Sequence, residues 1–213
     1  MLVKSLRARV RREGLWPAIR DAVGTLVPAR FEVWQLSGED ISRCDSSAKF
    51  AEILTSAAAE EALKRFRPTA KNLPVEFCRD EIDGIQTCFL ARVDGRPAAI
   101  AWSYDHTRPA HFLRMGPGDA EIRSVYSLDE FRGRGLAKAV IGTACNSLLR
   151  DGIRNIYAVI HFRNEASLRA FRSSGFMKVA ELRRPPIFGP RFVTTTGRAE
   201  SWLEAIARLF HSS

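Results

Sequence analysis

Cysteine and histidine are scarce in this sequence, and neither is arranged in a way that suggests a cross-link or a metal site. The 213 residues include four cysteines and four histidines. No two cysteines form a C-x-x-C pair, and neither His106 nor His111 has a second ligand at helical spacing. We therefore expect buried, reduced thiols and no bound metal.

Long apolar runs are absent as well. No stretch approaches the ~20 apolar residues with which a helix crosses a bilayer, so an integral membrane protein is not expected. The first residues, MLVKSLRARVRREGLW, have no apolar core behind their positive charges, which makes them a poor secretory signal. With 46% hydrophobic and 27% charged residues, the composition predicts a soluble, cytoplasmic chain that folds as one compact unit.

Positive charge is what the sequence has in excess. The formal net charge is +9, and residues 1–30 hold seven Lys or Arg against two acidic residues. A basic surface suits an anionic partner, but charge does not choose among a phosphorylated cofactor, nucleic acid and an anionic membrane. Residues 1–30 thus offer a contact for an anionic surface, or residues 1–24 form a solvated helix that covers the edge of the core.

The periodicity of the apolar residues predicts alternating helices and strands. Two strands at 87–104 are joined at Asp94-Gly95, a dipeptide favoured in tight hairpins because both residues tolerate positive φ. Further strands are expected at 31–36, 120–127, 153–160, 176–183 and 190–196, and helices at 1–24, 46–66, 134–149, 164–174 and 199–210. The predicted fold class is therefore α/β, of the α+β kind, with a mixed sheet.

Two arginines and two glycines stand together at Arg132 to Gly135, where a strand gives way to a helix. A helix N-terminus leaves backbone N–H groups without internal partners, and it attracts phosphate. The glycines remove side chains that would hold a phosphate away from the backbone, and they permit the positive φ of an anion-binding nest. We therefore favour a pyrophosphate-binding loop over a plain turn with solvated arginines.

The surroundings of this loop resemble a known family. RGRGLA (132–137) resembles the R/Q-x-x-G-x-G/A motif of the GNAT superfamily of acyl-CoA-dependent N-acyltransferases. Phe131 stands where the family commonly has an aromatic residue before this motif. NEASLRAFRSSGF (164–176) resembles the second motif of the family, an asparagine that opens a helix closing in Gly-Phe. The resemblance covers about residues 75–185.

This resemblance implies a mostly antiparallel central sheet flanked by helices. It also implies that residues 71–213 form an acyl-CoA-binding domain, on whose core residues 1–70 pack as an extension of helix and strand. The bound cofactor would be acetyl-CoA or another acyl-CoA, with its pyrophosphate held by the loop and its pantetheine arm lying along the preceding strand.

The implied cofactor-binding residues follow from matching the two motifs to this chain. Asn164 would face the pantetheine region, although capping a helix explains it equally well from the residues alone. The residues are Val125, Tyr126, Ser127, Arg132, Gly133, Arg134, Gly135, Leu136, Ala137, Asn164 and Phe171.

Acyl transfer to an amine needs a base, because an amine with a pKa of about 10.4 is mostly protonated at neutral pH. Glu121 lies six residues before Ser127, where some family members have a glutamate that activates the amine. It is equally well explained as an ordinary strand carboxylate or as a partner of Arg123, and Asp119 is the alternative base.

The leaving thiolate needs a proton, which many family members supply from a tyrosine on the second-motif helix. Here that position is Phe171, which has no proton to donate. Tyr126, Tyr157 and His161 are the candidates for the role, and water is another.

Three functions follow from these patterns. The first is an N-acetyltransferase that moves an acetyl or short acyl group from acyl-CoA to a primary amine, by direct attack in a ternary complex. The amine would belong to a small molecule or to a protein, and residues 1–70, 105–118 and 183–191 would choose it. The alternatives are an acyl-CoA-binding module without catalysis, favoured by Phe171, and a basic nucleic-acid or membrane-surface binder that uses residues 1–30.

Overall fold

The fold was analysed in a computed structural model, which describes residues 29–38, 51–70, 73–83, 87–107, 112–113, 115–184 and 191–195. The expected helices at 1–24 and 199–210 lie outside these ranges, as does almost all of the basic segment 1–30. Within the described part of the chain, no helix is long and apolar enough to cross a membrane.

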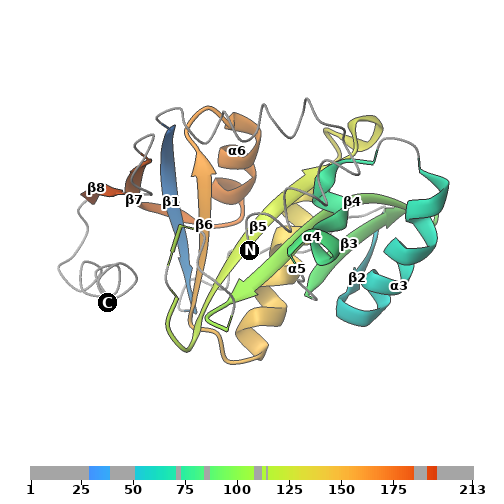
Figure 1. The fold of residues 1–213 in the computed structure, drawn as a ribbon, viewed down its shortest axis with the longest axis horizontal. Coiled ribbons are helices and arrows are strands. Elements are labelled where there is room, and N and C mark those ends of the chain that lie inside the picture. Colours follow the sequence, from blue (N-terminus) through green and yellow to red (C-terminus); the bar gives the residue numbers. More distant parts are fainter. Residues whose placement is uncertain are drawn as a thin grey trace.

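The described residues form an eight-stranded sheet in the order β2-β3-β4-β5-β6-β1-β7-β8 (Figure 1). All neighbouring strands are antiparallel except β5 and β6, so the expected mixed, mostly antiparallel sheet with flanking helices is confirmed. The strands are β1 (Ala29–Ser37), β2 (Glu52–Thr55), β3 (Cys88–Val93), β4 (Arg96–Asp105), β5 (Asp119–Ser127), β6 (Asn155–His161), β7 (Met177–Arg184) and β8 (Arg191–Thr195). The helices are α3 (Ser56–Phe66), α4 (Arg79–Asp83), α5 (Leu136–Arg150) and α6 (Glu165–Ser173).

The hairpin predicted at Asp94-Gly95 is present between β3 and β4. Asp94 has φ 50° and Gly95 has φ 77°, which is the pair of positive values that a tight two-residue turn needs. The strands at β1, β5, β6, β7 and β8 and the helices at α5 and α6 also lie where the periodicity predicted them, within a few residues at each end.

The single helix expected at 46–66 is wrong for residues 52–55, which form strand β2. The alanine-rich stretch that follows is helical, but Glu52 to Thr55 pair with β3 instead, and Glu52 forms an ion pair with Arg92 across the two strands. Pairing with a distant strand has overridden the local preference for helix in these four residues.

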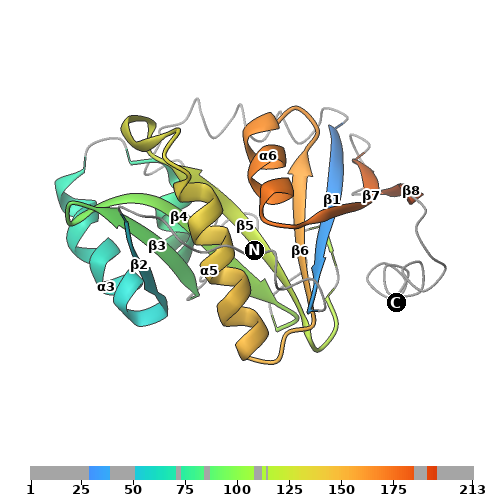
Figure 2. The ribbon, with the colours of Figure 1, turned by 180° about the vertical axis from the view of Figure 1, so that it is seen from behind.

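The two faces of the sheet carry different helices. Figure 2 shows α5 and α6 on one face, and Figure 1 shows α4 on the other, with α3 beside β2 and β3. Val140, Ile141 and Phe171 belong to a buried cluster between the sheet and the α5–α6 layer. Phe77 and Trp102 belong to a second buried cluster, beneath α3. Three of the cysteines, Cys78, Cys88 and Cys145, are buried and form no disulfide among the described residues, and Cys44 lies outside those residues.

Strand β1 lies inside the sheet, not at its edge. It pairs antiparallel with β6 on one side and with β7 on the other. Because β1 separates them, β6 and β7 run parallel to each other, and α6 makes the crossover between them (Figure 1). Residues 1–70, which were predicted to pack on the core as an extension, therefore supply an interior strand of the sheet.

Candidate functional site

The site begins where two neighbouring strands separate. Strands β5 and β6 pair only through Asp119 to Glu121 and Asn155 to Tyr157, although β5 continues to Ser127 and β6 to His161. The two strands meet at one end and diverge towards the other (Figures 1 and 2). We call the diverging part of the two strands, residues 122–127 of β5 and 158–161 of β6, the wedge. The β5 edge that faces this wedge therefore has backbone groups available to an extended ligand.

A β-bulge lies within the wedge. Trp102 on β4 is opposite Arg123, but Ile100 is opposite Tyr126, so that Ala101 faces the two β5 residues Ser124 and Val125. Ser124 has φ 52°, a value that a residue with a side chain rarely adopts. A bulge of this kind bends a strand and re-aims its side chains, and it separates the first half of β5 from the half that approaches the loop.

The loop after β5 forms an open N-terminus for α5. Gly133 and Gly135 have φ of 78° and 75°, and a Cβ on either would meet no atom within 4 Å. Gly135 is the N-cap of α5 and offers no side-chain hydrogen bond, in contrast to Asn164, whose side chain caps α6. The first N–H groups of α5 are thus left for another acceptor.

A cavity of about 490 Å³ lies beside this loop. Its size is ordinary for the binding site of a small ligand. It is lined by Val125, Tyr126, Ser127, Phe131, Arg132, Gly133, Gly135, Leu136, Ala137, Asn164, Ala166, Ser167, Arg169 and Ala170. The end of β5, the glycine loop and one face of α6 are therefore brought together around a single space.

Nine of the eleven residues predicted to bind the cofactor line this cavity; Arg134 and Phe171 do not. The guanidinium of Arg134 lies over the ring of Phe131, 5.4 Å from its centroid. Phe171 is buried in the core, where its ring meets that of Phe176 edge-on. Phe171 thus occupies the family position on α6, but its side chain points into the core and not into the cavity.

Sequence reasoning missed the α6 residues that line the cavity. Ala166 and Ala170 are one helical turn apart, and Ser167 and Arg169 flank them on the same side. Two small residues at this spacing, next to a capping asparagine, were the available signal, because they let a ligand approach the helix closely. Asn164 caps α6 as predicted, because its Oδ1 accepts from the Ser167 N–H over 3.2 Å, and it also lines the cavity.

Tyr126 joins the cavity to the loop. Its hydroxyl donates to Asp129 Oδ1 over 3.3 Å and accepts from Arg132 Nη2 over 3.2 Å. Burial, followed by the nearby Asp129 carboxylate, raises the pKa of the phenol, which therefore stays neutral. Both hydrogen bonds of the hydroxyl are therefore made to loop residues at the wide end of the wedge.

Glu121 occupies the narrow end of the wedge, as the last β5 residue that pairs with β6. Only 2% of its surface is exposed, and its Oε1 accepts no hydrogen bond from the described residues. Burial raises the pKa of this carboxyl to about 7, against a smaller opposing effect of Arg123. A carboxyl with this proton affinity can both hold and release a proton near neutral pH.

The other predicted proton-transfer residues lie elsewhere. Asp119 accepts hydrogen bonds from the Asn155 side chain and from the Gly116 N–H, which makes it part of the structure at the start of β5. His161 ends β6, and its Nδ1 accepts from the Arg163 N–H over 3.2 Å. Tyr157 is fully buried opposite Glu121.

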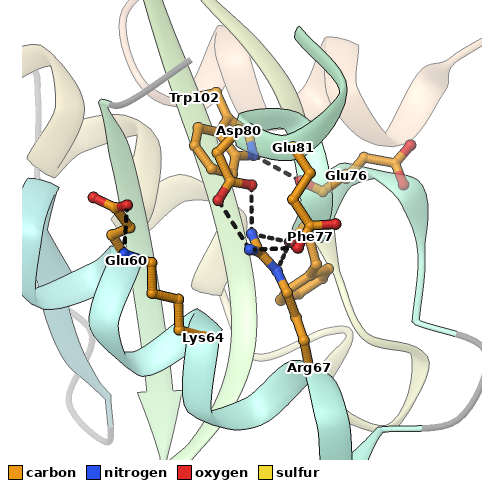
Figure 3. Close-up of polar contacts among 8 residues, drawn as sticks. All are labelled: Glu60, Lys64, Arg67, Glu76, Phe77, Asp80, Glu81 and Trp102. Atoms are coloured by element: carbon orange, nitrogen blue, oxygen red, sulfur yellow. Dashed lines mark hydrogen bonds and ion pairs between the residues drawn. The ribbon is translucent and has the colours of Figure 1, made fainter. Parts of the chain in front are cut away.

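A polar cluster around Arg67 holds the segment that supports Tyr126 (Figure 3). Arg67 donates to the Phe77 carbonyl oxygen over 2.8 and 3.0 Å, and to both oxygens of Asp80. Trp102 donates from its indole to the Glu76 carbonyl oxygen over 2.6 Å. These contacts fix Phe77, whose ring meets the Tyr126 ring edge-on at 6.3 Å.

Comparison with known proteins agrees with this geometry. A model of the acetyltransferase (GNAT) family matches residues 51–176, from just before β2 to just before β7. The chain belongs to the GNAT acetyltransferase family. The match begins upstream of the domain boundary predicted at residue 71 and includes β2 and α3. No curated protein matches the chain.

Two solved structures illustrate the shared fold. A GCN5-related N-acetyltransferase from Kribbella flavida is 16% identical with a TM-score of 0.50, over 88% of this chain and 66% of that one. One from Sphaerobacter thermophilus is 17% identical with a TM-score of 0.50, over 80% of this chain and 55% of that one. The present chain thus spans between about half and two thirds of their lengths, and the likeness concerns the GNAT fold.

Proposed function

We propose that this GNAT protein is an N-acyltransferase that moves an acetyl or short acyl group from acyl-CoA to a primary amine. One observation carries the proposal: strand β5 holds a buried carboxyl of raised pKa where it last pairs with β6, and it leads at its other end into an anion-attracting loop that borders a cavity. The proposal assigns acyl-CoA binding to the loop end of β5 and the base to Glu121, six residues before Ser127.

The residues around the cavity fit coenzyme A. The uncapped N-terminus of α5 and the two glycines suit a pyrophosphate, and Arg132 adds a cation at the rim. The free β5 edge from Ile122 to Ser127 suits the amide groups of a pantetheine arm, which would add to the sheet as an extended strand does. Ala166 and Ala170 leave room on the α6 side.

Acyl-CoA would supply a thioester, which a neutral amine attacks so that a C–N bond forms, the C–S bond breaks and the thiol is released. We assign to Glu121 the removal of one proton from the acceptor ammonium, directly or through a water molecule. The amine in the ternary complex then has the lone pair that the attack needs. The second N–H proton of the amine balances the thiolate, so no separate protein acid is required.

In this assignment Tyr126 and His161 transfer no proton and have structural functions instead. The Tyr126 hydroxyl is held between Asp129 and Arg132 at the loop, where it orders the pyrophosphate site. His161 supports the turn that leads into α6 through the Arg163 N–H. Together with Phe171 in the usual tyrosine position, this leaves proton supply to the thiolate with the amine itself.

Binding is tested by isothermal titration with acetyl-CoA, desulfo-CoA and dephospho-CoA. Gly135→Trp is expected to abolish binding of acetyl-CoA, because its side chain would fill the space in front of the α5 N–H groups. Gly152→Trp is the matched control: Gly152 also has a positive φ (84°) and open space around its Cα, but it lies beyond the other end of α5. Its binding should equal that of the wild type.

Turnover is tested by following thiol release from acetyl-CoA with a panel of primary amines. Acetylated amine in the product, lost in Glu121→Gln with binding intact, supports the full proposal. Binding of acetyl-CoA without acetylation of any amine would leave an acyl-CoA-binding module and remove the enzyme. No binding by folded wild type would overturn the cofactor assignment itself.

A further inference from the structure

Arg123 lies on the same face of β5 as Glu121, between this carboxyl and the wide end of the wedge. The two residues are two positions apart in a regular part of the strand, so their side chains point the same way. The bulge begins at the next residue, Ser124. Arg123 is therefore the last side chain of this face before β5 turns towards the loop.

The guanidinium is held by an aromatic ring and approaches the carboxyl without bonding to it. Its Cζ lies 4.4 Å from the centroid of Tyr104, which is the β4 residue directly opposite Glu121. Its Nε lies 3.6 Å from Glu121 Oε1, which is longer than a hydrogen bond. Only 21% of the Arg123 side chain is exposed, so solvent screens the pair weakly.

This geometry suits a buried base, which has to be ionised and also has to keep an oxygen available for the proton. Burial alone favours the neutral carboxyl, which cannot accept a proton, and a cation in contact counteracts burial. A tight, hydrogen-bonded ion pair would ionise the carboxyl but would also occupy the oxygen that has to take the proton. At 3.6 Å the charges attract each other while the Oε1 lone pairs remain available.

The groups that face Glu121 from the neighbouring strands are uncharged. Tyr104 lies opposite it on β4, and Tyr157 lies opposite it on β6. Met115 packs against the clusters on this face of the sheet. Among the described residues, Arg123 is the charged side chain whose field acts on Glu121, and it opposes the effect of burial.

We propose that Arg123 is the positioning residue of the proposed transferase site: its guanidinium, held on the Tyr104 ring, favours the ionised form of the buried Glu121 carboxyl and leaves it open to a proton from the acceptor amine. The inference rests on the proposed function of Glu121 and adds to it the residue that sets the pH range in which the base works. Arg123 itself touches neither the acyl group nor the amine.

The test that needs no turnover is a titration of the Glu121 carboxyl by carbon NMR, with the signal assigned by its loss in Glu121→Gln. In Arg123→Met the midpoint should move upward by about one pH unit, in line with the effect of one nearby opposite charge. Arg123→Lys should restore most of the difference. An unchanged midpoint in Arg123→Met would overturn the inference.

Variants of Tyr104 keep the test decisive if Arg123→Met does not fold. Tyr104→Leu retains both charges but removes the ring that holds the guanidinium, so the midpoint should rise by a smaller amount. Tyr104→Phe keeps the ring and should leave the midpoint within about 0.3 units, as expected for a contact to the ring face alone. Equal midpoints in Tyr104→Leu and Tyr104→Phe would contradict the role given to the ring.

The rate test uses an amine found in the panel. In Arg123→Met the acidic limb of the kcat/KM profile should move upward with the NMR midpoint, while the alkaline plateau stays within about twofold of the wild type, because the base is still present. A uniform loss at every pH would indicate a structural role and overturn the inference. An NMR shift without acetylation of any amine would retain the charge effect of Arg123 and reject the proposed transferase function.

Discussion

Asn155 donates from Nδ2 to Asp119 Oδ1 over 2.8 Å, and this bond joins the first residues of β6 and β5 at the point where the two strands are still paired. Asn155 Oδ1 in turn accepts from Nε2 of the buried Gln35 on β1 over 3.1 Å. Three strands are thus connected at the narrow end of the wedge, and the opening on the other side starts from a fixed point.

Replacement of Asn155 should loosen this point. Asn155→Leu leaves the Asp119 carboxylate and the Gln35 amide each without one partner, which should lower the free energy of unfolding by about 1–3 kcal/mol. Urea unfolding followed by circular dichroism measures the change. Thr107→Val serves as the control, because it removes a hydrogen bond to Asp105 that is exposed, and it should cost under about 0.5 kcal/mol. Equal costs would refute the structural role of Asn155.

The polar cluster around Arg67 in Figure 3 gives a second prediction about stability. The side chains of Arg67 and Asp80 are 10% and 14% exposed, so Arg67→Met should leave a nearly buried carboxylate unpaired and cost about 3 kcal/mol. Arg65→Met is the matched control, because the pair of Arg65 with Glu61 is largely exposed and should contribute less than about 0.5 kcal/mol. A thermal or urea transition of each variant decides between them, and similar values would contradict the prediction.

The raised pKa of Glu121 predicts how stability depends on pH. The unfolded chain releases this proton near pH 4.5, but the folded protein keeps it until about pH 7. The folded state therefore binds more protons between these values, and the contribution of Glu121 to stability is full below pH 4.5 and is lost as the pH rises towards 7.

Glu121→Gln resembles the protonated side chain at every pH, so it should escape this loss. Relative to wild type, the variant should gain little at pH 4.5 and become more stable at pH 8, by at most on the order of 3 kcal/mol. Urea unfolding of both proteins at pH 5, 6, 7 and 8 measures the difference. A constant difference across this range would show that the carboxyl titrates normally.

Asn164 allows the helix cap to be separated from the cavity wall. Asn164→Ala removes the bond to the Ser167 N–H and should cost about 1 kcal/mol. Asn164→Asp retains a good cap and the stability, but it adds a negative charge to the wall of the proposed coenzyme A cavity. Acetyl-CoA should then bind about fivefold more weakly, as expected for ~1 kcal/mol of repulsion in a solvated site. Unchanged affinity in Asn164→Asp would place the cofactor away from α6.

Much of the fold was predictable because its signals are local. The Asp94-Gly95 turn, the cap at Asn164 and the glycine loop at 133–135 each depend on a few adjacent residues whose preferences are strong. Strand β2 was missed because its pairing with β3, including Glu52 with Arg92, depends on residues 40 positions away.

The candidate site divides in the same way. The loop residues were predictable from their motif, but the burial of Glu121 was not, because it depends on neighbours from β4 and β6 that only the sheet brings together. The stacking of Arg123 on Tyr104 likewise joins two strands, and the sequence showed Arg123 only as a partner of Glu121. The burial of Phe171, on the core side of α6, reflects tertiary packing against Phe176.

The position of β1 determines the order in which this protein can fold. Strand β1 is synthesised before both of its partners, at a large distance along the chain; Gln35 and Asn155, for example, are 120 residues apart, and Glu32 and Lys178 are 146 apart. Contacts of such large sequence separation slow folding, because the chain loses loop entropy before they form. Strand β1 therefore has two unpaired edges until β6, α6 and β7 have left the ribosome, and such edges can pair with another chain.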